Sequence, residues 1–191
     1  MKNYYLWLKA RGQLWPFLSK SSLLSLISSQ KTREIKVCFL GDGLLVNERG
    51  ILVSNKDLSF TEAERELLLK MAFAMGLGEG EVILENIEVT SPEKVNTTQA
   101  QLNLLLRRFT PFVIITLGSF AAKALLGESI DFQKVRGQWS NTSLGEDQRL
   151  YEILPTFHPR DLLCSPEYKR PTWEDLKVVM SKLAEKRAII S

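Results

Sequence analysis

The chain contains a single histidine, His158, which follows an apolar run and directly precedes a proline. An imidazole between a predicted strand and a predicted helix can donate a hydrogen bond or carry a proton at the edge of a sheet. A histidine in such a turn can also serve only to cap backbone groups. His158 is therefore the first candidate for chemistry, with a purely structural role as the alternative.

Other polar residues follow predicted strands in the same way. Gly41, Asp42 and Gly43 follow the first apolar run, residues 86–90 end the second, and Gly118 with Ser119 follows the third. Ligands of open α/β sheets bind beyond the carboxyl ends of the strands. The sequence therefore predicts one site that combines these turns with the His158 loop.

The elements that must position this site are four predicted strands and the helices between them. The strands are expected at residues 35–40, 82–89, 112–117 and 150–157, and their β-branched, non-alternating runs suit a buried parallel sheet. Helical patterns cover residues 60–75, 96–108, 119–126 and 172–187, and residues 140–149 are expected to form a polar loop. This alternation predicts a three-layer α/β/α domain with a mainly parallel four-stranded sheet.

Composition narrows the classes of protein that fit. The chain has 191 residues, 45% of them hydrophobic, and a formal net charge of +3, which permits nucleic-acid binding without arguing for it. No apolar stretch approaches the roughly 20 residues of a spanning helix, and charges interrupt the first hydrophobics. We therefore expect a cytoplasmic protein with no membrane partner. Two cysteines provide neither a disulfide framework nor a cysteine-rich metal site.

From about residue 35 to residue 183 the chain resembles the uracil-DNA glycosylase superfamily, and it is most similar to the iron–sulfur branch, family 4. The resemblance is carried by several linked motifs in order: residues 113–127 (strand, glycine turn and Ala-rich helix), residues 135–139 (Val-Arg-Gly-Gln-Trp), residues 155–159 (Pro-Thr-Phe-His-Pro), Lys169 with Arg170, and residues 173–176 (Trp-Glu-Asp-Leu). Motifs that recur together in this order are more specific than any one alone.

The resemblance implies that a deoxyuridine is turned out of the DNA stack and that the bond between base and sugar is hydrolysed. His158 would then donate to the charge that develops on the leaving base, and Asp42 would orient water or stabilise the sugar cation. Asn86 would bind the edge of the base and Phe60 would stack on it, beside Gly41 and Gly43. The structural alternatives are an Asx turn for Asp42, a strand-end cap for Asn86 and a hydrophobic staple for Phe60.

The same resemblance implies contacts with DNA around the site. Leu162 and Leu163 lie where the family inserts an apolar wedge into the vacated stack, although leucines there can also pack beneath a loop. The other expected DNA contacts are polar: Ser119, Arg136, Lys169 and Arg170.

Two departures from the family pattern bear on function. The first family motif is Gly-Glu-Ala-Pro-Gly, whereas this chain has Gly41-Asp42-Gly43-Leu44-Leu45. The iron–sulfur branch needs four cysteines, yet Thr90 stands at the third place and residues 1–34 contain none. We therefore expect no cluster and no other cofactor.

These observations leave two functions open. The first is a glycosylase that removes uracil, or a related damaged base, from single- or double-stranded DNA. The alternative is a non-catalytic binding module on the same fold, comparable to the psi subunit of bacterial DNA polymerase III. In that case the aromatic and Ser-rich segment of residues 1–34, which precedes the glycosylase-like domain of residues 35–191, would dock on a protein partner. Its aromatic side chains could instead pack on the domain itself.

Overall fold

The computed structural model describes residues 36–46, 52–54, 59–78, 80–87, 95–145 and 148–190. The predicted N-terminal segment, residues 1–34, lies outside these ranges, so the proposed domain boundary stays a prediction. None of the helices within the described ranges is both long enough and apolar enough to cross a lipid bilayer.

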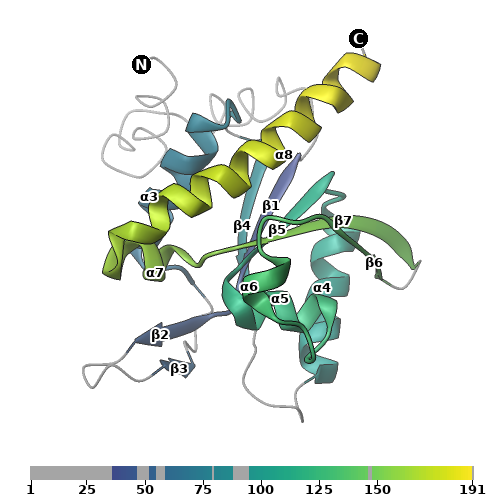
Figure 1. Cartoon of the computed structure of the whole chain (residues 1–191). Helices are drawn as coiled ribbons and strands as arrows, with labels where there is room; N and C mark the ends of the chain where they lie inside the picture. Colours follow the sequence, from purple (N-terminus) through teal and green to yellow (C-terminus); the bar gives the residue numbers. More distant parts are fainter. Residues whose placement is uncertain are drawn as a thin grey trace, which may run out of the picture.

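A five-stranded sheet forms the centre of the fold, with the strand order β4-β1-β5-β7-β6 (Figure 1). In that order the strands are β4 (Val82–Asn86), β1 (Val37–Gly41), β5 (Val113–Leu117), β7 (Arg149–Thr156) and β6 (Ser140–Leu144). The first four pair in parallel and β6 is antiparallel to β7. The four predicted parallel strands are therefore confirmed, and the sheet has one strand more than expected.

The additional strand, β6, shows that the predicted polar loop of residues 140–149 is wrong. Its polar sequence contains only one buried side chain, that of Leu144, because it forms an edge of the sheet. Its hydrogen bonds to β7 supply the pairing that its composition does not indicate.

Helices cover both faces of the sheet. On one face, α3 (Glu62–Ala74) and α8 (Lys169–Ile190) pack against a core that includes Phe39, and α8 crosses the sheet in Figure 1. On the other face, α4 (Val95–Arg108) and α5 (Gly118–Leu126) pack against a core that includes Leu40. Consecutive residues of a strand point to opposite faces, so β1 contributes to both cores. The predicted three-layer α/β/α class is confirmed.

Several short elements were not predicted. They are the hairpin β2 (Leu44–Val46) and β3 (Leu52–Ser54), the helices α6 (Phe132–Val135) and α7 (Pro159–Cys164), and the 3-10 turn η4 (Pro166–Tyr168). The strand β2 begins directly after the turn that carries Asp42, and α7 begins directly after His158. These two elements therefore fix the ends of the loops at which the candidate chemistry lies.

Candidate active site

The carboxyl ends of β1 and β4 meet at Gly41, which pairs in register with Asn86. A Cβ atom at position 41 would collide with Asn86 Oδ1 and would lie 2.9 Å from the Phe60 ring. Glycine therefore permits both side chains to lie against the end of β1. The Phe60 ring in turn lies beside the His158 ring, with 5.9 Å between the ring centroids and an angle of 31° between the planes.

His158 is held in a defined tautomer at the start of α7. Its Nδ1 accepts a hydrogen bond from the Arg160 backbone N–H at 3.2 Å, so the proton of the neutral ring belongs on Nε2. The side chain is only 2% exposed, and this burial, helped by the Arg160 charge, lowers the pKa of His158 well below its usual 6.5. The imidazole is thus neutral at physiological pH, and its free donor is Nε2–H. It also caps α7, which is the structural role expected as the alternative.

Asp42 is completely buried and both of its carboxylate oxygens have partners. Oδ1 accepts the Leu44 backbone N–H at 3.1 Å, which is the Asx turn expected as an alternative, and Oδ2 forms an ion pair with Arg160. Burial raises the pKa of Asp42, although the neighbouring Arg160 opposes this rise. Oδ1 lies 3.8 Å from His158 Nε2, so the carboxylate and the ring donor face each other.

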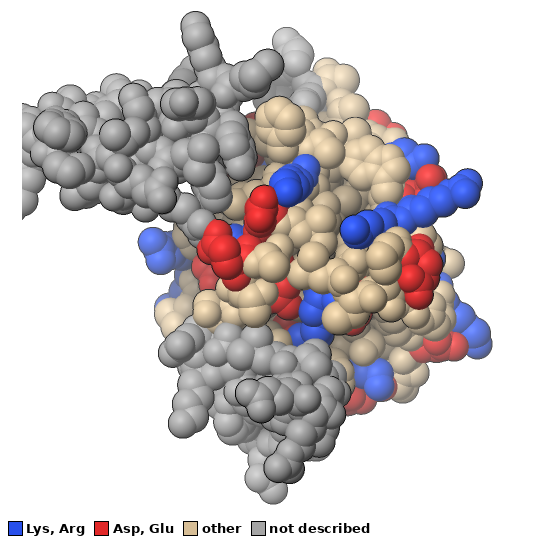
Figure 2. Space-filling view, turned by 90° about the vertical axis from the view of Figure 1, so that its left-hand side faces the viewer, with Lys and Arg blue, Asp and Glu red and all other residues tan. Residues whose placement is uncertain are grey.

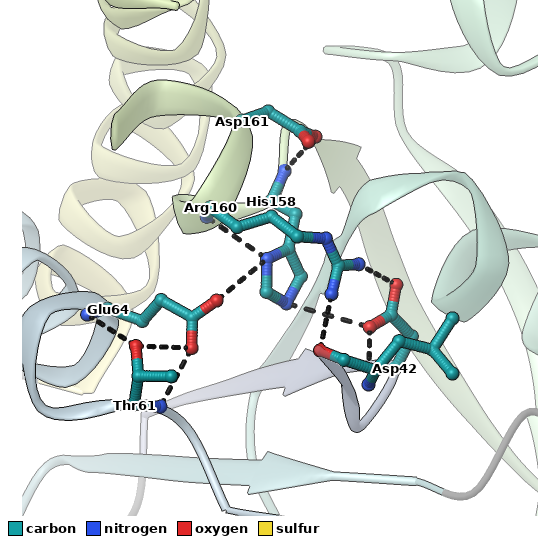
Figure 3. Close-up of polar contacts among 7 residues, drawn as sticks. Asp42, Thr61, Glu64, His158, Arg160 and Asp161 are labelled. Atoms are coloured by element: carbon teal, nitrogen blue, oxygen red, sulfur yellow. Dashed lines mark hydrogen bonds and ion pairs between the residues drawn. The ribbon is translucent and has the colours of Figure 1, made fainter. Parts of the chain in front are cut away.

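A second carboxylate approaches the imidazole from the opposite side. Glu64 Oε2 accepts hydrogen bonds from the N–H and the hydroxyl of Thr61, both at 2.8 Å, in a capping box that starts α3. Glu64 Oε1 lies 3.7 Å from His158 Nδ1, and the Glu64 side chain is only 6% exposed. Figure 3 shows the His158 ring between Glu64 and Asp42, with Arg160 reaching over it to Asp42.

Asn86 presents a polar atom toward the same place. Its Oδ1 is buried and has no hydrogen-bond partner among the residues that the structure describes. Leaving a buried acceptor unpaired costs about 1–3 kcal/mol. An N–H donor on a bound ring would offset this cost, so the position suits recognition of the edge of a base.

The residues predicted to contact DNA are placed differently from one another. Leu162 is 2% exposed and belongs to the core, so it is not placed to act as a wedge, whereas Leu163 is 46% exposed. Arg136 forms an ion pair with Asp175 through Nη1 at 2.5 Å, which holds one end of its guanidinium group within the fold. Lys169 and Arg170 are exposed at the start of α8, and Ser119 is partly exposed on α5. Their contacts with DNA stay predictions.

The charges on this side of the molecule are mixed. Figure 2 shows the side on which α3 and α7 lie, where Lys and Arg side chains alternate with Asp and Glu around an uncharged centre. Among the residues drawn in colour no continuous basic patch appears. Any DNA contact on this side would therefore depend on individual cations and apolar side chains.

The described residues do not fit the cysteine-bound cluster of the iron–sulfur branch. Cys38 is buried within β1, and Cys164 is exposed at the end of α7. In the described part of the chain, no group of three or more His, Cys, Asp or Glu side chains is arranged to hold a metal ion. The Thr90 position lies outside the described residues.

The structure brings the predicted residues His158, Asp42, Asn86 and Phe60 together and adds three that were not predicted: Glu64, Arg160 and Asp161. The Asp161 carboxylate accepts the His158 backbone N–H at 3.3 Å. The pattern Thr-x-x-Glu at residues 61–64 signals a capping box and would have indicated a fixed Glu64. No local signal indicates the Arg160 contact, because its partner lies 118 positions away.

The fold defines an α/β protein in which polar side chains gather at the carboxyl edge of the parallel strands. A family model described as the uracil DNA glycosylase superfamily matches residues 30–177, well over half of the chain. The chain belongs to this superfamily, so the predicted superfamily is confirmed, whereas the similarity to the iron–sulfur branch stays a prediction.

Proposed function

We propose that the protein is a DNA glycosylase that extrudes uracil, or a related damaged base, and hydrolyses its bond to deoxyribose. The observation that carries this proposal is the arrangement around Gly41, where an aromatic ring, an unpaired amide oxygen and a neutral imidazole donor lie side by side. DNA as the substrate class is supported by membership of the superfamily.

Each of the three side chains has a separate task toward the flipped base. Phe60 stacks on the ring, a contact worth roughly 1–3 kcal/mol per base. Asn86 Oδ1 accepts the ring N–H of uracil. His158 Nε2–H donates to the base oxygen on which negative charge develops, and one well-placed donor of this kind contributes about 3–4 kcal/mol. A neutral imidazole can fill this role because its second nitrogen is already held by the Arg160 amide.

Asp42 acts in this arrangement as a fixed negative charge beside the site. Glycosidic bond hydrolysis develops positive charge on the sugar, and a carboxylate close to it lowers the barrier. Both Asp42 oxygens have partners, so electrostatic stabilisation of the sugar cation fits better than direct activation of water.

The test is incubation of the protein with uracil-containing single- and double-stranded oligonucleotides, followed by detection of abasic sites. We expect excision by the wild type and a loss of about 100- to 1,000-fold in the variant His158→Gln. Lys36→Gln is the matched control, because it removes an ion pair with Glu81 at the amino end of β1, away from the site. Absence of abasic sites at stoichiometric protein would contradict the proposal.

The Arg160–Asp42 ion pair favours a second candidate, a non-catalytic binding module that keeps the fold. A fully buried carboxylate whose charge is balanced by an arginine suits a purely structural ion pair as well as a catalytic group. The variant Asp42→Asn separates the two candidates. It keeps an acceptor for the Leu44 N–H and so preserves the turn, and a loss of turnover in this variant is expected only if the protein is an enzyme. For the module, we expect deletion of residues 1–20 to abolish capture of a protein partner, and unchanged partners would count against it.

A further inference from the structure

The side chain of Arg160 makes contacts to which the proposed chemistry assigns no role. From the first turn of α7 its Nη1 donates to the Leu44 carbonyl at 2.6 Å, and its Nη2 forms the ion pair with Asp42 Oδ2. The side chain is only 12% exposed. Its backbone N–H donates to His158 Nδ1. One residue therefore contacts both the acidic and the imidazole group of the site, as Figure 3 shows.

Within the described part of the chain, Arg160 supplies the hydrogen bonds that join the turn carrying Asp42 to α7. The turn's own hydrogen bond, from Leu44 N–H to Asp42 Oδ1, fixes the carboxylate only within the turn. Gly43, at the centre of the turn, has a φ of 59°, in the left-handed region that glycine adopts readily. A planar guanidinium group can bind a carboxylate and a carbonyl at once, whereas a single ammonium is a point charge without this fork.

We propose that Arg160 is the positioning residue of this site, which fixes Asp42 and His158 relative to each other through its guanidinium group and its backbone amide. The positioning itself does not depend on the enzymatic activity. Its catalytic consequence rests on the proposed function, in which Asp42 and His158 act on the sugar and on the base.

The charges around the imidazole support this assignment. Asp42 faces the ring from the turn after β1, Glu64 faces it from α3, and Arg160 and Asp161 belong to α7. Two carboxylates within 4 Å of an imidazole favour its protonated form. Burial and the Arg160 charge outweigh them, so that the pKa of His158 lies well below 6.5. Without the cation, burial alone would oppose the carboxylates, so the pKa of His158 would rise.

His158 is the only histidine, so its titration can be followed by NMR without assignment of other imidazole signals. In Arg160→Gln we expect the titration midpoint of His158 to move to higher pH than in the wild type. In the control Lys36→Gln we expect no movement of the His158 midpoint, because residue 36 lies about 16 Å along β1 from the strand end at Gly41. A midpoint in Arg160→Gln equal to that of the wild type would overturn the proposal.

Arg160→Lys keeps the charge and tests the bridge separately, also in case Arg160→Gln does not fold. We expect its His158 midpoint to stay near that of the wild type, because a cation remains beside the ring. The Leu44 amide hydrogen should exchange faster with solvent, because one ammonium cannot hold both the Asp42 carboxylate and the Leu44 carbonyl. Exchange as slow as in the wild type would overturn the bridging role.

If the wild type excises uracil, the kinetics of these variants add a readout that a merely structural role would not move. Arg160→Lys should lower kcat by about 100-fold with little change in KM. In Arg160→Gln the acidic limb of kcat/KM should shift to higher pH, because Arg160 lowers the pKa of both Asp42 and His158. An unmoved limb would count against the proposal. Absence of excision by the wild type would contradict the proposed function alone, since the NMR measurements do not depend on turnover.

Discussion

His158 combines a structural and a chemical position in one side chain. Nδ1 caps the first turn of α7, and Nε2 faces Asp42 across 3.8 Å. Because the cap occupies the nitrogen that would otherwise take up a proton, the same contact that stabilises the helix keeps the ring a neutral donor. If His158 donates to a leaving base, as we propose, the loop cannot lose its cap without also changing this donor.

The neutral state of His158 leads to a prediction about stability and pH. The folded pKa is lowered, so the unfolded chain takes up a proton as the pH falls through about 6.5 while the native imidazole does not. The wild type should therefore lose stability from this residue between about pH 7.5 and pH 5.5, by at most about 1.4 kcal/mol per pH unit. Urea denaturation at both pH values would measure the free energy of unfolding.

The matched comparison for this prediction is the variant His158→Gln, which has no imidazole to titrate. Asp42 and Asp161 have raised folded pKa values because they are buried, so they contribute an opposite trend, with stability lost as the pH rises. Both groups are present in the two proteins, so the difference between them isolates His158. Equal losses in the wild type and the variant would show that His158 has the same pKa in the native and the unfolded chain, which would contradict the lowered pKa.

At the residue scale, the sequence predicts contacts between side chains only when parallel strands bring those side chains to the same edge of the sheet. His158, Asp42 and Asn86 end or follow strands that run parallel, and parallel strands share one carboxyl edge. The contacts of Arg160 and Glu64 depend on how α7 and α3 sit beyond that edge. Neither helix packing nor side-chain reach can be predicted from sequence spacing, so the contacts of these two residues with the site emerge only from the structure.

At the element scale, α7 gives Leu162 and Leu163 different surroundings, although the sequence predicts the same role for both. Leu162 packs in the core beside the helices α3 and α8, and Leu163 points to solvent. We predict that Leu162→Ala lowers the free energy of unfolding by about 2–5 kcal/mol, whereas Leu163→Ala changes it by about 0.5 kcal/mol or less. Thermal or urea denaturation of the two variants side by side would measure both values.

The same pair of variants tests which leucine contacts DNA. Leu163→Ala should weaken excision, or binding to uracil-containing DNA, while keeping the wild-type stability, because an exposed leucine beside the His158 loop can enter the base stack. Binding and excision by Leu163→Ala that equal those of the wild type would contradict a wedge at this position. Stability of Leu162→Ala close to that of the wild type would contradict its place in the core.

The elements that the sequence predicts well are those whose own composition requires burial. The strands β1 and β5 are buried along their whole length, and their apolar runs indicate them directly. The edge strand β6 reads Ser-Asn-Thr-Ser-Leu and forms only because β7 offers hydrogen bonds to it. Short elements such as α6 and α7 depend on the ends of longer ones, so their presence follows from tertiary packing.

At the scale of the whole molecule, one polar cluster joins three parts of the fold that lie apart in the sequence. Asp175 on α8 accepts hydrogen bonds from Arg136, which follows α6, and from the Thr156 hydroxyl on β7 at 2.6 Å. The Arg136 guanidinium also lies 4.8 Å from the centre of the Phe157 ring. Burial raises the pKa of Asp175, so the charged form of this carboxylate depends on the groups that donate hydrogen bonds to it.

We therefore predict that this cluster contributes to stability as a unit. Arg136→Met leaves the Asp175 carboxylate buried with only the Thr156 hydroxyl, and removing one partner of such a pair costs about 3–5 kcal/mol. The double variant Arg136→Met with Asp175→Leu removes both charges and should be more stable than Arg136→Met alone. Urea denaturation of the wild type, both single variants and the double variant gives the coupling energy.

The contacts of Arg136 in this cluster bear on whether it binds DNA or acts only within the fold. If Arg136 binds phosphate in the complex, its substitution should reduce the salt dependence of DNA affinity, because fewer counterions are released. If it acts only within the fold, Arg136→Met should lower stability and leave that dependence unchanged. The ion pair with Asp175 already holds Nη1 of the guanidinium within the fold, so we expect the second result. Additive effects of the two substitutions on the free energy of unfolding would contradict the coupling on which this expectation rests.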